Sequence, residues 1–119
     1  MPKGDDIMER LLSLAVSVAQ IFRDMAKKEC PNHISNQLLR SGTSPAANYA
    51  EARSAESRKD FIHKLGIVLK ELNECLVWIQ LLRRLQYVDK DTPEPLQAEC
   101  AELCRIIAAS IKTVSTRNG

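Results

Sequence analysis

The sequence contains few aromatic residues, few glycines and few histidines. Aromatic residues make up 4% of the 119 positions, so a core has to be built from Leu, Ile, Val and Ala. Four glycines leave little material for a phosphate-binding loop or a dinucleotide fingerprint; neither motif occurs, and neither does G-x-S-x-G. No stretch approaches the roughly 20 apolar residues of a membrane span. We therefore expect a soluble protein that is not an enzyme.

Cysteine and net charge are also limited. The four cysteines are Cys30, Cys75, Cys100 and Cys104, and none forms a C-x-x-C pair. The charged N-terminal residues do not resemble a signal peptide, so we expect a reduced, cytoplasmic protein that uses its thiols as small apolar groups. The net charge of +2 is too small to indicate nucleic-acid binding by itself.

Apolar residues recur at steps of three and four along four segments, which is the pattern of amphipathic helices. The expected helices cover about residues 5–28, 32–55, 57–86 and 95–116. Short connections make neighbouring helices antiparallel, and no strand pattern competes. We predict an all-α, up-down-up-down four-helix bundle that forms one domain over residues 1–119. The clearest apolar series belongs to the third helix: Phe61, Leu65, Val68, Leu72, Cys75, Ile79 and Leu82.

The second helix contains the unusual stretch RSGTSPAANYAEA at residues 40–52. Pro45 has no amide hydrogen, and its ring crowds the carbonyl group of Ser41. The helix can break there and restart with Ser44 as its cap, or it can continue with a kink near residues 42–45. Because the apolar residues on both sides of the proline keep one phase, we predict the kinked helix.

The small residues of this stretch leave room for Arg40, Asn48 and Glu51 to reach polar partners. The third helix offers Glu71 and Glu74 across the bundle. We predict that these five residues form a polar network, which sets the register of the two helices more than it adds stability. The alternative is that the two glutamates of the third helix face solvent.

Two stretches, QLLRSGTSPAANYAEA and SRKDFIHKLGIVLKELNECLVWIQLL, resemble the bacterial four-helix bundle proteins encoded in intervening sequences of 23S ribosomal RNA genes. That family includes relatives of the accessory variability determinant of diversity-generating retroelements. The resemblance covers about residues 5 to 115, and it departs from the family pattern at Pro45 and Ala46, where an Ile-Gly pair is usual. The matching positions are Arg40, Ser41, Ser44, Asn48, Glu51, Ser57, Asp60, Phe61, Glu71 and Glu74.

The resemblance implies a homopentamer, with the bundles arranged as a barrel around a central axis, and no catalytic activity. Some relatives bind nucleic acid or a reverse transcriptase, so RNA, DNA and a reverse transcriptase are candidate partners. No membrane partner is expected.

Basic residues gather around the junction of the second and third helices. We predict that Arg53, Arg58, Lys59 and Lys64 bind nucleic acid or a partner protein; the alternative is an ordinary solvated surface. A closed ring would repeat the cluster by symmetry and raise its affinity for phosphates. Because aromatic residues for stacking are missing, any nucleic-acid binding should be directed at the backbone and tolerant of sequence.

The third helix carries a second apolar stripe that includes Ile62 and Leu81 beside its main series. One bundle core cannot easily enclose both stripes, so the second stripe suggests an interface between copies of the chain. The alternative is a wide core with the tryptophan at its end. The residues predicted for this interface are Tyr49, Leu69, Leu76 and Trp78.

A metal site is the remaining possibility for a four-helix bundle. Di-iron bundles use Glu-x-x-His motifs on two helices. This chain offers Asp60 with His63, whereas the other spaced pairs, Glu71/Glu74 and Glu99/Glu102, lack histidine. We therefore predict no metal and no cofactor. The leading functional prediction is a non-enzymatic homo-oligomeric scaffold; the alternatives are a protein-interaction adaptor and a carboxylate-bridged metal protein.

Overall fold

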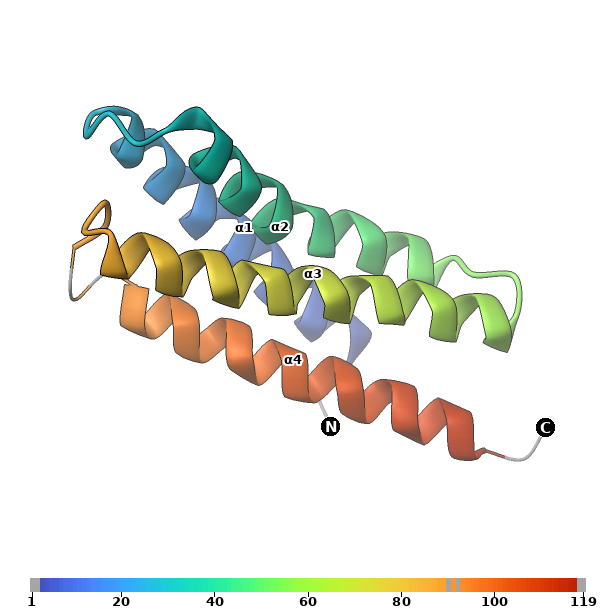
Figure 1. The fold of residues 1–119 in the computed structure, drawn as a ribbon. Coiled ribbons are helices and arrows are strands. Elements are labelled where there is room, and N and C mark those ends of the chain that lie inside the picture. The colour runs from blue at the N-terminus through green and yellow to red at the C-terminus, as the bar shows by residue number, and fades with distance from the viewer. Residues whose placement is uncertain (1–2, 90, 92, 118–119) are drawn as a thin grey trace.

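The computed structural model describes residues 3–89, 91 and 93–117, and within them the chain forms four α-helices and no strand (Figure 1). Residues 1–2, 90, 92 and 118–119 of the predicted domain lie outside the described residues. The prediction of an all-α four-helix bundle is confirmed for the described part of the chain. The helices are α1 (Gly4–Ala26), α2 (Asn32–Arg53), α3 (Arg58–Arg84) and α4 (Pro93–Thr116).

Each helix runs antiparallel to the one before it, and the four make an elongated bundle of 52 × 22 × 20 Å (Figure 1). α1 packs on α2, α2 on α3 and α3 on α4, while α4 returns to α1 with the fewest contacts of any neighbouring pair. α1 and α3 therefore lie diagonally across the bundle, as do α2 and α4. The outward faces of α1 and α3 therefore lie on opposite sides of the bundle, and so do those of α2 and α4.

Local chemistry explains where the helices begin and end. Ser57 caps α3 because its hydroxyl accepts a hydrogen bond of 3.0 Å from the backbone N–H of Asp60. α1 ends at Ala26, two residues before the expected position, and the following turn places Glu29 at a φ of 58°. α4 begins at Pro93, two residues earlier than expected, because proline is well suited to the first turn of a helix.

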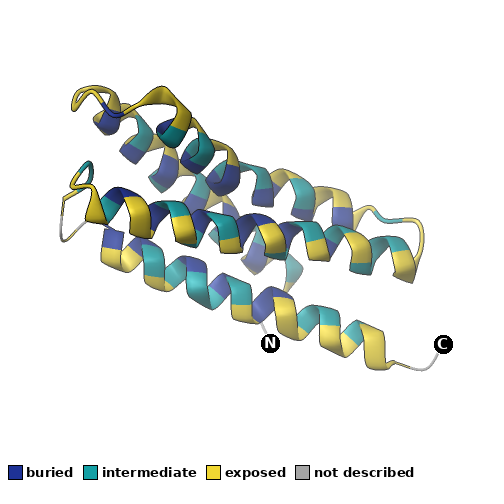
Figure 2. Ribbon diagram, in the orientation of Figure 1, coloured by how far each residue is buried: buried dark blue, intermediate teal, exposed yellow. Residues whose placement is uncertain are grey.

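Buried residues of all four helices, most of them aliphatic, form the core, and Figure 2 marks the buried positions on each ribbon. The main apolar series of α3 supplies Leu65, Val68, Leu72, Cys75, Ile79 and Leu82, all buried. Phe61, the first member of that series, is partly buried and packs against the core. In the described residues, no helix combines the length and the apolar character that crossing a bilayer requires.

Helix α2 passes through Pro45 without a break. The hydroxyls of Ser41 and Thr43 donate to carbonyl groups one turn earlier, at Gln37 (2.9 Å) and Leu39 (2.6 Å), instead of to the Ser41 carbonyl that Pro45 leaves without its usual donor. Pro45 itself is buried. The break-and-restart alternative is therefore wrong, and the proline lies inside the helix with its ring in the packed interior.

Candidate functional site: the α2–α3 polar network and the outer surface

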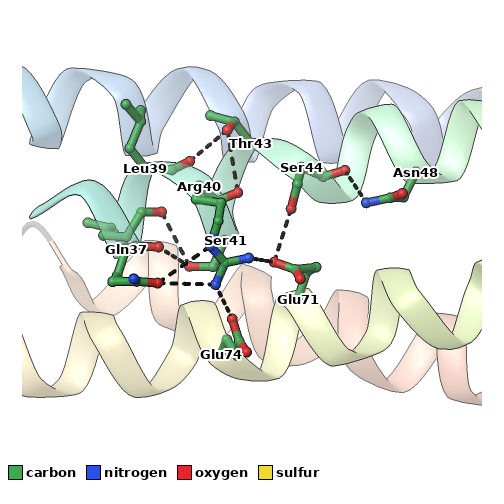
Figure 3. Close-up of polar contacts among 10 residues, drawn as sticks. Gln37, Leu39, Arg40, Ser41, Thr43, Ser44, Asn48, Glu71 and Glu74 are labelled. Atoms are coloured by element: carbon green, nitrogen blue, oxygen red, sulfur yellow. Dashed lines mark hydrogen bonds and ion pairs between the residues drawn. The ribbon is translucent and has the colours of Figure 1, made fainter. Parts of the chain in front are cut away.

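Arg40 of α2 lies between Glu71 and Glu74 of α3 and binds both (Figure 3). Its Nη1 donates to Glu71 Oε2, and its Nη2 donates to Glu74 Oε2. Gln37, one turn before Arg40, accepts from the same guanidinium at 3.3 and 3.4 Å. Because α3 positions 71 and 74 are three residues apart, both carboxylates occupy one helix face and can share one arginine.

Glu71 is the most enclosed charged group of this network. Its side chain is 12% exposed, against 46% for Arg40 and 37% for Glu74. The hydroxyl of Ser44 also donates to Glu71 Oε2, at 3.1 Å. The hydrogen bond to Glu74 is the main cause that raises the pKa of Arg40, and partial burial opposes it. A buried carboxylate with two donors ties α2 to α3 at one register.

The other two residues predicted for the network lie elsewhere. Asn48 donates its side-chain amide to the backbone carbonyl of Ser44 on its own helix, at 3.1 Å (Figure 3). Glu51 pairs with Lys64 across the end of the bundle, at 3.4 Å. The structure thus joins Arg40 to both glutamates of α3 and leaves Asn48 and Glu51 outside this cluster.

The basic residues near the α2–α3 junction are partly occupied by partners in the same chain. Arg53 pairs with Asp5 at 2.8 Å, and Lys64 pairs with Glu51. Arg58 donates to the backbone carbonyl of Arg117 at 3.2 Å. Lys59 is exposed next to Arg58 at the start of α3. Two of the four predicted cations, Arg53 and Lys64, are thus paired with acidic groups of the same chain.

The residues predicted for an interface divide into buried and partly buried ones. Tyr49 is 5% exposed, and burial raises the pKa of its hydroxyl. Its ring belongs to the core because α2 turns this face toward the centre of the bundle, so the ring offers almost no free surface. Leu69, Leu76 and Trp78 are partly buried and pack against the core from α3.

The most exposed large apolar residues are different ones, and the sequence pattern alone did not single out most of them. On α3 they are Val77 (60% exposed), Leu81 (36%) and, at its end, Leu85 (45%). On α1 they are Leu12 (45%) and Val16 (56%). Each set follows i, i+4 spacing and so forms a row along one helix face.

The two glutamates of α4 that could suggest a metal centre are held by arginines. Glu99 receives two hydrogen bonds from Arg10 of α1, at 2.8 and 2.6 Å, and Glu102 pairs with Arg105 on its own helix. Among the described residues, no three His, Cys, Asp or Glu side chains come together as metal ligands would. The Arg10–Glu99 pair joins residues that are 89 positions apart in the sequence, and no local pattern predicts it.

The comparisons with known proteins agree with this architecture. The sequence matches the family described as 23S rRNA-intervening sequence protein over residues 5–109. Among solved structures, the chain is similar to a protein of unknown function from the S23 ribosomal protein family of Bacteroides thetaiotaomicron, with 36% sequence identity and a TM-score of 0.85. That likeness covers 89% of this chain and 98% of the other. No curated protein matches the chain.

Proposed function

The chain belongs to the 23S rRNA-intervening sequence protein family, and on that premise we propose that it is a non-enzymatic scaffold that self-associates and binds a partner through its outer surface. The observation that supports this most is the row of exposed apolar residues formed by Val77 and Leu81 of α3 and by Leu85, which directly follows the helix. Isolated apolar residues on a surface are ordinary, but a continuous row with polar surroundings is typical of an interaction site.

A second row supports assembly into a ring. Leu12 and Val16 of α1 are exposed on the helix that lies diagonally across the bundle from α3. Two different apolar surfaces on opposite sides of one subunit suit a head-to-tail contact, in which the α3 face of one copy meets the α1 face of the next. Head-to-tail contacts close into rings when the rotation between subunits permits, and the family resemblance implies a ring of five.

The proposed partner is nucleic acid or a protein that handles it, such as a reverse transcriptase. Lys59 and Arg58 lie side by side at the exposed start of α3, and a ring would present them once per subunit. Repeated contacts with phosphates raise affinity even where each contact is weak. Among the described residues around the start of α3, no aromatic residue is exposed, so the contacts would be with the backbone of the nucleic acid.

The alternative is a protein-interaction adaptor without a nucleic-acid role. The ion pairs of Arg53 with Asp5 and of Lys64 with Glu51 favour it, because a cation already paired in the chain gains less from a phosphate. The apolar rows would serve an adaptor equally well.

Size-exclusion chromatography with light scattering tests whether the protein assembles. We expect a mass several times the 13.4 kDa of one chain. Val77→Glu with Leu81→Glu should give monomers, and so should Leu12→Glu with Val16→Glu. A mixture of these two double variants should form dimers, because one intact α1 face meets one intact α3 face and the chain of contacts stops there. Gln80→Glu, also exposed on α3, is the matched control that should assemble normally. A monomeric native protein would exclude the ring.

Fluorescence polarisation with labelled RNA and DNA over a salt series tests the partner. We expect Lys59→Glu to weaken binding at low salt by about tenfold or more, since a ring repeats the change in every subunit. Lys70→Glu, which makes the same charge change at another exposed position of α3, should have a smaller effect. Absence of binding at the lowest salt would favour the adaptor.

A further inference from the structure

A pocket lies at the end of the bundle where α1 and α3 begin and α2 and α4 end. Its volume is about 410 Å³, within the range of roughly 300–1,000 Å³ that small-molecule sites occupy. All four helices contribute to its wall, and none of the lining residues belongs to the exposed apolar rows of α1 and α3. The wall combines apolar side chains with two arginines and a tyrosine, which is the composition of a site for a small polar-headed molecule.

Tyr49 of α2 brings an unpaired hydroxyl to this pocket. The residue is only 5% exposed, yet within the described part of the chain its hydroxyl has no hydrogen-bond partner, and solvent reaches it. Burial raises the pKa of this hydroxyl, the positive charge of Arg53 lowers it and the negative charge of Asp5 raises it, so both charged groups are close by. Buried phenolic hydroxyls usually find a partner, and a molecule in the pocket would supply the one that Tyr49 lacks.

The guanidinium of Arg53 lies over the first turn of α1. A Cβ at Gly4 would be 3.1 Å from both Cζ and Nε of Arg53, so the lack of a side chain at Gly4 makes room for the guanidinium. Arg53 Nη1 pairs with Asp5 at 2.8 Å, and the Asp5 side chain is 89% exposed, so solvent screens this pair. Because a guanidinium has five N–H donors, Arg53 can bind Asp5 and a ligand at the same time.

Two further features favour an anion. Lys3 precedes α1 without providing a side-chain cap, and the first N–H groups of a helix together with its dipole attract negative charge. Arg117, which follows α4, lines the pocket as a second cation. The two arginines of the wall and the Asp5 partner leave one net positive charge, which suits one negative charge better than a doubly charged phosphate group.

We propose that this pocket binds a small carboxylate with an apolar body. The carboxylate accepts hydrogen bonds from the Tyr49 hydroxyl and from the Arg53 guanidinium, whose planar fork matches its geometry. The apolar body lies against Ile7, Phe61 and Val114. Because the pocket is formed within one subunit, this binding does not depend on the assembly or on the nucleic-acid partner proposed above.

Calorimetric titration with octanoate tests the site. We expect saturable binding of one octanoate per chain. Octanol, which keeps the tail without the carboxylate, and acetate, which keeps the carboxylate without the tail, should each bind more weakly by about tenfold or more. In methyl NMR spectra the signals of Ile7 and Val114 should shift, whereas that of Val77 in the outer row should not. Absence of saturation, equal binding of octanol, or shifts confined to the exposed apolar rows would overturn the proposal.

The role of the hydroxyl is tested by Tyr49→Phe, which keeps the buried ring. Octanoate should bind about tenfold more weakly, because the carboxylate loses a donor. The free energy of unfolding in urea should not fall, since the hydroxyl has no partner among the described residues. Tyr87→Phe is the matched control, because Tyr87 follows α3 at the opposite end of the bundle and should leave the affinity unchanged. A loss of stability without a loss of affinity in Tyr49→Phe would assign the hydroxyl to the fold and overturn the proposal.

The role of the guanidinium is tested by changes of opposite sign. Arg53→Gln should weaken octanoate binding by about tenfold or more, whereas Arg84→Gln, which removes an exposed arginine at the far end of α3, should not. Asp5→Asn should tighten binding by roughly threefold, because it removes the carboxylate that competes for Arg53 and repels the ligand. Unchanged affinity in Arg53→Gln, or weaker binding in Asp5→Asn, would overturn the proposal.

Discussion

Helix α1 is held in different ways on its two sides. Toward α2, Gly42 brings the backbone so close that a methyl group there would lie 2.6 Å from Cγ2 and 2.7 Å from Cγ1 of Val18. Toward α4, the two helices contact each other least, and the bidentate Arg10–Glu99 pair bridges them. A groove of about 330 Å³ lies along this second side, lined by Ser13, Leu14, Ser17, Gln20, Ile21, Asp24, Pro95, Leu96 and Glu99.

This difference shows that one helix can be positioned by shape on one side and by a polar bridge on the other. A closely packed seam admits no added volume, since interiors have the density of crystals. A seam with a groove and an ion pair accepts added volume and separates with little loss of packing. α1 and α4 are the first and last helices, so no loop joins them either. We therefore expect that added side-chain volume destabilises the fold on the α2 side of α1 and not on its α4 side.

The largest effect is expected from adding volume on the α2 side. Gly42→Val should lower the free energy of unfolding by about 3 kcal/mol, because Val18 is fully buried and β-branched and has little freedom to move away. Urea unfolding followed by circular dichroism measures this change. Combining it with Val18→Ala should recover part of the loss, because the double variant frees the space that the new side chain occupies.

The matched control is Gly66→Val on α3. Gly66 is exposed in mid-helix, and a methyl group there would meet nothing within 4 Å. The free energy of unfolding should stay within about 0.5 kcal/mol of the native value, since valine is a slightly better helix former than glycine. Similar losses at Gly42 and Gly66 would refute the close approach of α1 and α2.

A smaller effect is expected at the α2–α3 seam, where packing is combined with the ion pairs of Arg40. Arg40→Met should lower the free energy of unfolding by about 2 kcal/mol. The substitution removes the cation that pairs with Glu71 and leaves this carboxylate, only 12% exposed, beside the carboxylate of Glu74. The value is below that of a deeply buried pair because Arg40 is itself 46% exposed. Adding Glu71→Gln to Arg40→Met should recover stability; if the double variant loses as much as the sum of the two single ones, the pair is not coupled.

The sequence predicted the helices of this bundle well, because their apolar residues repeat in a regular order. The series from Leu65 to Leu82 identifies the buried face of α3, and the proximity of Arg40 to the α3 glutamates follows from the opposed faces of two neighbouring helices. The exposed row is harder to predict. A modest rotation of α3 about its axis decides whether Leu76 or Val77 faces outward, and the broad apolar stripe permits both.

The contacts on the two sides of α1 could not be predicted from local pattern. The pairing of Arg10 with Glu99 and the fit of Gly42 against Val18 depend on where distant segments come to lie. Tyr49 illustrates the same limit: a large amphipathic side chain is equally compatible with a core and with an interface, and only the packing of α2 decides between them.

Adding side-chain volume on the α4 side of α1 should raise the free energy of unfolding instead of lowering it. Ser17 is next to Val18 in the sequence but lines the α1–α4 groove and is only partly buried. We expect Ser17→Leu to raise the free energy of unfolding by about 1 kcal/mol, because leucine is a better helix former and buries apolar surface in the groove. Urea unfolding alongside Gly42→Val provides the comparison. A loss comparable with that of Gly42→Val would mean that the groove is as tightly packed as the α2 side.

The smallest effect is expected from removing the bridge itself. Arg10→Met should lower the free energy of unfolding by about 0.5 kcal/mol, since Arg10 and Glu99 are 32% and 36% exposed and solvent screens their attraction. The loss should shrink at high salt, where screening weakens the native pair as well.

Arg105→Met is the control, because Arg105 pairs with Glu102 within α4 and joins no two helices. Hydrogen exchange distinguishes the two: loss of Arg10 should speed the exchange of α1 amides selectively, whereas loss of Arg105 should not. Faster exchange throughout the bundle would instead show that the Arg10–Glu99 bridge supports the whole fold and that the α4 side of α1 does not open independently.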